Sequence, residues 1–69
     1  MRGMTVTYWH NGNKLRSYFG DAASQELYHE FQILRNGAGQ IIASFDPQCV
    51  LGIEDHNEPL AAKEEKNDV

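Results

Sequence analysis

The dipeptide Asn11-Gly12 most constrains the fold of this chain, because it joins two runs of residues with strand character. A two-residue type I′ turn needs positive φ at both central positions, and Asn-Gly adopts it readily. The dipeptide therefore predicts a hairpin of two strands, Met4–His10 and Asn13–Phe19. Counting outward from the turn pairs Tyr8 with Leu15, Val6 with Ser17 and Met4 with Phe19 on a buried face. The outward face then carries Trp9 opposite Lys14, Thr7 opposite Arg16 and Thr5 opposite Tyr18.

The segment from Phe31 to Glu54 is the most apolar part of the chain. Its apolar residues recur at every second position, the period of a strand with one buried face: Phe31 and Ile33, then Ile41, Ala43 and Phe45, then Cys49, Leu51 and Ile53. A three-residue loop, Gly37-Ala38-Gly39, would pair Phe31 with Phe45, Ile33 with Ala43 and Arg35 with Ile41. Asp46-Pro47-Gln48 then predicts a corner before a last strand from Cys49 to Glu54.

The segment from Gly20 to Glu30 allows two interpretations. Asp21 suits a helix N-cap, and Ala23, Leu27, Phe31 and Leu34 fall at helical spacing, which predicts a helix from Ala22 to Arg35 and a ββαββ domain. Against the helix, Phe31-Gln32-Ile33-Leu34 has strand character, and the glycine loop gives a consistent register only if these residues form a strand.

A resemblance favours the strand. The run Ile42-Ala43-Ser44-Phe45, followed by Asp46 to Glu54, resembles the C-terminal half of many short bacterial and phage-type proteins with no assigned function. They open with a hairpin similar to Thr7–Phe19 here. The resemblance spans most of residues 4–54. It implies a mainly β fold, a small antiparallel five-stranded meander or half-open barrel, and it implies no activity. We expect residues 1–54 to form this single domain.

The net charge of −4 is unevenly distributed along the sequence. Acids and bases balance from Met1 to Ile53, so the whole excess of acid lies from Glu54 onward. We expect residues 55–69 to form an acidic, solubilising tail that is disordered past about His56, because few apolar residues are present to bury.

The sequence predicts no catalytic residue, no metal site and no cofactor. His10, His29, His56 and Cys49 have spacings that match no zinc motif. The single cysteine is expected in the core, and no run is long enough for a membrane helix. A cytoplasmic location is the resulting expectation.

The outward face of the first hairpin is the candidate binding surface, formed by Thr7, Trp9, Lys14, Arg16 and Tyr18. Residues 1–20 contain three bases and no acid. Bases beside exposed aromatic rings suit a protein partner, and they also suit single-stranded nucleic acid. We expect a non-enzymatic protein-binding or regulatory module from a phage or mobile-element background. The alternatives are a single-stranded nucleic-acid binder and a small enzyme. We also expect a homodimer through the first hairpin, with Met4–His10 or Cys49–Glu54 as exposed edge strands and Trp9 near the seam.

Overall fold

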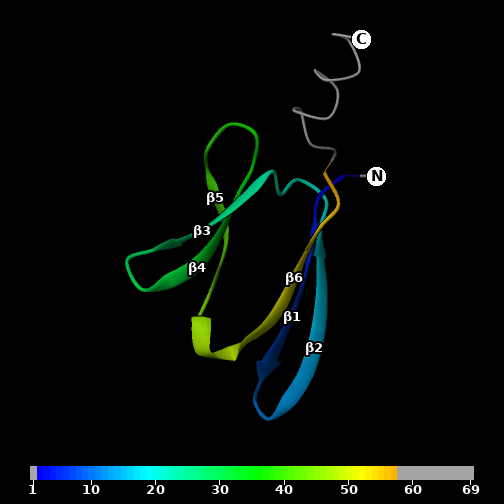
Figure 1. The fold of residues 1–69 in the computed structure, drawn as a ribbon, viewed down its shortest axis with the longest axis vertical. Coiled ribbons are helices and arrows are strands. Elements are labelled where there is room, and N and C mark those ends of the chain that lie inside the picture. Colours follow the sequence, from blue (N-terminus) through cyan, green and yellow to red (C-terminus); the bar gives the residue numbers. More distant parts are fainter. Residues whose placement is uncertain (1, 58–69) are drawn as a thin grey trace, which may run out of the picture.

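The computed structural model describes residues 2–57, which form two three-stranded antiparallel sheets (Figure 1). The elements are β1 (Met4–His10), β2 (Asn13–Phe19), β3 (Ser24–Tyr28), β4 (Phe31–Arg35), β5 (Ile41–Phe45), the 3₁₀ turn η1 (Pro47–Cys49) and β6 (Val50–Asp55). Sheet A has the order β2-β1-β6 and sheet B the order β3-β4-β5. The predicted mainly β, antiparallel fold is confirmed, with six strands in two sheets where five in one meander were expected.

The first hairpin has the register that Asn11-Gly12 predicts. Every pair from Met4 with Phe19 to His10 with Asn13 is formed. Asn11 and Gly12 have φ values of 51° and 77°, as a type I′ turn requires. The local turn chemistry therefore fixes which face of β1 and β2 points into the molecule.

β6 pairs with β1, so Met4–His10 is the central strand of sheet A and not an edge. The expectation of an exposed edge at Met4–His10 is wrong, because the last strand returns to cover it. The last strand itself is an edge of sheet A, as its alternative prediction had it. Thr7 lies opposite Gly52 and Tyr8 opposite Val50, which leaves Leu51 as a bulged residue that is 50% exposed. The bulge overturns the predicted burial of Leu51, and Val50 packs against the core in its place. The predicted inward position of Ile53 is confirmed, since it packs against the core as well.

β3 and β4 form a second hairpin where the helix from Ala22 to Arg35 was the alternative. Its turn residues, His29 and Glu30, have φ values of 48° and 70°, close to those of Asn11 and Gly12. The turn thus has the backbone shape of the first hairpin without its favoured residues.

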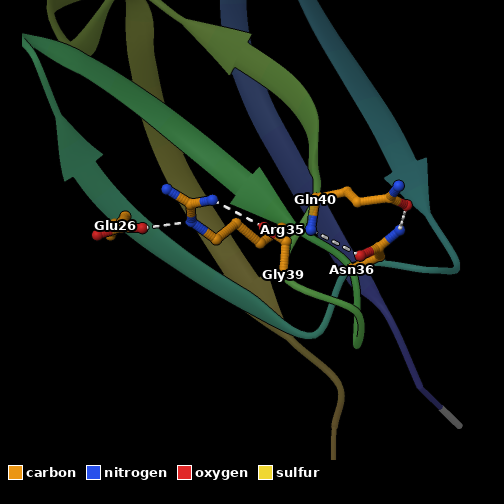
Figure 2. Close-up of polar contacts among 5 residues, drawn as sticks. All are labelled: Glu26, Arg35, Asn36, Gly39 and Gln40. Atoms are coloured by element: carbon orange, nitrogen blue, oxygen red, sulfur yellow. Dashed lines mark hydrogen bonds and ion pairs between the residues drawn. The ribbon is translucent and has the colours of Figure 1, made fainter.

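The β4–β5 connection contains the predicted three-residue loop. The Asn36 N–H donates to the Gln40 carbonyl at 3.0 Å, and Gly39 has a φ of 84°. The Asn36 side chain closes the loop further, since its Oδ1 accepts from the Gln40 N–H and its Nδ2 donates to Gln40 Oε1 (Figure 2).

The predicted register of β4 and β5 is correct only beside this loop. Arg35 pairs with Ile41, but Ile42 is bulged, so Ala43 lies opposite Leu34 and Phe45 opposite Gln32. The expected pairs of Phe31 with Phe45 and Ile33 with Ala43 are wrong, because the extra residue shifts the ladder by one. Phe31 is consequently 51% exposed.

The core lies between the inner face of sheet A and one face of sheet B. Its fully buried members are Met4, Val6, Ala22 and Leu34. Tyr8, Phe19, Ala43, Phe45, Val50 and Ile53 pack around them. The Phe45 ring links the sheets, with centroids 4.9 Å from Tyr8 and 6.0 Å from Phe19. Ile33 is buried outside this cluster.

The predicted corner at Asp46-Pro47-Gln48 is present as η1, and Asp46 caps it by accepting the Gln48 N–H. Cys49 belongs to this turn and is half-buried, so the last strand begins at Val50 and not at Cys49. After β6, the His56 N–H donates to Gly3 O and Asn57 Nδ2 donates to Ala22 O. Most of the expected acidic tail, residues 58–69, lies outside the described residues. No helix in the described range is long and apolar enough to cross a membrane.

Candidate functional site

All five residues predicted as a binding surface lie on one face of sheet A, the face turned away from the core. We call it the outer face, and it consists of Thr5, Thr7, Trp9, Lys14, Arg16, Tyr18, Gly52 and Glu54. β1 supplies its middle row, β2 the basic row and β6 a row that the sequence analysis did not foresee.

Glu54 changes the charge of this face. Its carboxylate accepts a hydrogen bond from the Arg16 guanidinium across β1 and forms an ion pair with it. That hydrogen bond and the attraction to Arg16 lower the pKa of Glu54 below its ordinary value, and His56 adds a smaller effect in the same direction. One of the two bases on the outer face is therefore neutralised within the chain.

Tyr18 anchors one end of the outer face. Its hydroxyl donates to the carbonyl of Arg2, and its ring centroid lies 6.2 Å from that of His56. His56 Nε2 in turn lies 2.9 Å from Thr5 Oγ1. Tyr18 is still 53% exposed, so the polar edge of the ring is engaged while much of its surface remains free for a contact.

Trp9 and Lys14 form the other end, as a directly opposed pair beside the first turn. Trp9 is 46% exposed. It lies four residues along β1 from Thr5, the partner of Tyr18, which places the two aromatic positions about 13 Å apart at the strand rise of 3.3 Å per residue. Neighbouring bases in a strand of nucleic acid are about 3.4 Å apart when stacked, so the two rings do not match adjacent bases.

Gly52 makes the centre of the outer face flat. It lies opposite Thr7 in the middle of β6, and a Cβ added there would meet no atom within 4 Å. Glycine inside a strand weakens it and often marks a place where another backbone approaches closely. Packing within residues 2–57 gives no steric reason for a glycine at this position.

The sequence alone did not predict that Gly52 and Glu54 belong to the outer face or that His56 lies beside it. Their position depends on the pairing of β6 with β1, which joins distant parts of the chain. The signal available beforehand was charge: Arg16 lies among bases and Glu54 opens the acidic segment.

A cavity of about 320 Å³ lies beside Trp9, lined also by Tyr8, His10, Ser44, Phe45, Asp46 and Cys49. It brings a thiol, an imidazole and a carboxylate into one neighbourhood. Among the described residues no hydrogen bond joins these three groups, because His10 Nε2 contacts Asn11 and Asp46 Oδ1 accepts the Gln48 N–H. Residues 2–57 thus show no nucleophile-to-base contact at this cavity.

Residues 2–57 contain no group of three His, Cys, Asp or Glu side chains placed to hold a metal ion. No family model matches the chain, and no curated protein and no solved structure does so either. Any proposal for function therefore depends on the geometry and chemistry of the described residues.

Proposed function

We propose that this chain is a small, non-enzymatic module that binds a protein partner through the outer face of sheet A. One observation carries the proposal: exposed Trp9 and Tyr18 flank a centre in which Arg16 is already paired with Glu54. Aromatic anchors with few free charges between them are typical of the middle of protein interfaces.

Single-stranded nucleic acid is the second candidate, favoured by Lys14 directly beside Trp9. Such a ligand requires free cations along its backbone and rings that stack on successive bases. Pairing of Arg16 and the wide separation of Trp9 from Tyr18 both weaken this candidate. We rank it below a protein partner for these two reasons.

A second copy of the chain is one partner of the outer face, so the proposal includes assembly into a homodimer. Because β1 is central in its sheet, the contact would join two outer faces and would not extend the sheet through β1. The flat centre at Gly52 lets a second such face approach closely.

The test starts from capture of partners out of an extract of the native host by three immobilised chains: the parent, Trp9→Ser and Leu51→Ser. Leu51 is the matched control, since it is an equally exposed apolar residue of sheet A that is bulged out of the ladder. The proposal expects a protein retained by the parent and by Leu51→Ser and lost by Trp9→Ser. Equal retention by all three would contradict it.

A salt titration with the purified partner and with oligothymidylate separates the two candidates. Trp9 is the only tryptophan, so its fluorescence reports binding to the outer face directly. Contact with phosphates weakens steeply as salt rises, whereas an apolar protein contact does not. Tight, salt-sensitive binding of oligothymidylate would favour nucleic acid.

A further inference from the structure

A second surface lies away from the outer face, between the tip of the β3–β4 hairpin and the corner at η1. The hairpin extends away from sheet A, and η1 lies beneath it in the view of Figure 1. A cavity of about 480 Å³, which we call the notch, is lined by Leu27, Glu30, Phe31, Asp46, Pro47 and Gln48.

The notch combines apolar walls with two acids. Leu27 and Phe31 are 65% and 51% exposed, so their apolar surface is uncovered. Glu30 and Asp46 form no ion pair with any described residue, because the two pairs found in residues 2–57 are those of Arg16 with Glu54 and Arg35 with Glu26. Asp46 uses one carboxylate oxygen to cap η1. The notch is thus negative, partly apolar and unoccupied by any base of the described chain.

Elsewhere on sheet B, an acid and an aromatic ring together contact an arginine side chain. The Arg35 guanidinium donates to Glu26 at 2.5 Å and to the Gly39 carbonyl at 2.8 Å (Figure 2), and it lies 5.3 Å from the centre of the Tyr28 ring. On sheet B, a carboxylate, a carbonyl oxygen and an aromatic ring thus surround one guanidinium. The notch offers the corresponding groups in Glu30, Phe31 and Asp46.

We infer that the notch is a binding site for an arginine side chain presented by a partner protein. The aliphatic part of the side chain would cover Leu27, and the guanidinium would face Phe31 while its N–H groups donate to Glu30 and Asp46. Arginine fits better than lysine because its planar, weakly hydrated cation stacks on rings and donates in several directions. This inference is independent of the outer face and does not require the proposed function to hold.

The probe is N-acetylarginine amide, titrated into the folded chain while backbone amide signals are followed by NMR. N-acetylcitrulline amide is the neutral control of the same shape, and N-acetyllysine amide is the control for a different cation. We expect shifts confined to Leu27, Glu30, Phe31, Asp46 and Gln48. The arginine probe should bind at least about threefold more tightly than citrulline, as two exposed charge contacts would give. Shifts that map elsewhere, or equal binding of arginine and citrulline, would overturn the site.

Two isosteric variants test the acids. Glu30→Gln removes the charge at the hairpin tip, and Asp46→Asn removes the other while keeping an oxygen that can cap η1. Each should weaken the arginine probe about two- to fivefold, and the double variant should bind arginine no better than citrulline. Asp21→Asn, which changes an exposed acid outside the notch, should leave affinity unchanged. A folded double variant, shown by its dispersed amide spectrum, that retains parent affinity would refute the inference.

Discussion

Arg16 on β2 and Glu54 on β6 are joined across the central strand β1, so one ion pair links the two outer strands of sheet A. Both side chains are more than half exposed. Exposed pairs contribute little to stability, and this pair acts mainly on the charge of the outer face.

The pH dependence of this pair follows from the lowered pKa of Glu54. The stabilisation is fully present above the ordinary pKa of a glutamate in the unfolded chain, and it is lost as the pH falls through the lowered folded value. Carbon-detected NMR titration should show Glu54 titrating below its ordinary value in the parent. In Arg16→Gln the value should rise, and an unchanged value would mean that the pair does not form in solution.

Phe45 is expected to be essential for joining the sheets, since its ring contacts Tyr8 and Phe19. Phe45→Ala should lower the free energy of unfolding by about 3 kcal/mol, the lower end for a phenylalanine truncation because the ring is only half-buried. Phe31→Ala is the control, since half of this residue is exposed, and it should cost under about 1 kcal/mol. Urea unfolding of both variants measures the difference, and equal losses would contradict the register of β4 and β5.

A better turn sequence at His29 and Glu30 should raise the stability of the chain. Both residues have positive φ, which costs a residue with a Cβ about 1–2 kcal/mol. Replacing them with Asn-Gly should raise stability by about 1 kcal/mol in thermal unfolding, after the entropy lost by glycine is counted. The reverse exchange, His-Glu in place of Asn11-Gly12, should destabilise the first hairpin. A neutral result in both exchanges would show that the two turns do not share this geometry.

The dimer is tested by sedimentation at micromolar concentration. We expect the parent to sediment as a dimer, and Trp9→Ser to shift it toward monomer, because an exposed aromatic at the seam would be lost. Leu51→Ser should leave the dimer intact. Monomers in all three samples would exclude the dimer, and a dimer that survives Trp9→Ser would move the interface away from the outer face.

The first hairpin could be predicted to the residue because Asn11-Gly12 specifies both the turn and the pairing that follows from it. The second hairpin had no such signal, since His29 and Glu30 adopt positive φ although neither residue type is typical of such turns. Period-two counting places Ala43, Phe45 and Ile53 against the core correctly. It fails for Phe31 and Leu51, because bulges at Ile42 and Leu51 shift the ladder by one residue.

Only the part of the candidate site that depends on local pairing could be predicted from the sequence. Its β1 and β2 residues follow from the local hairpin, and all five lie where the sequence places them. Gly52 and Glu54 reach the outer face only through pairing between distant segments, which neither composition nor local periodicity specifies.

The pairing of Val6 with Ile53 also determines the order in which the molecule can assemble, because the whole of sheet B lies between them in sequence. The local hairpins can close in about 1–10 μs, whereas joining β6 to β1 requires the intervening chain to be gathered first. We therefore expect sheet A to be completed late in folding. An intermediate with both hairpins formed and β6 still unpaired would present β1 as an open edge without Glu54 opposite Arg16. Such a species adds β1 to the edge strands β2, β3, β5 and β6 of the finished domain, so it is more exposed to unwanted strand pairing than the finished domain is.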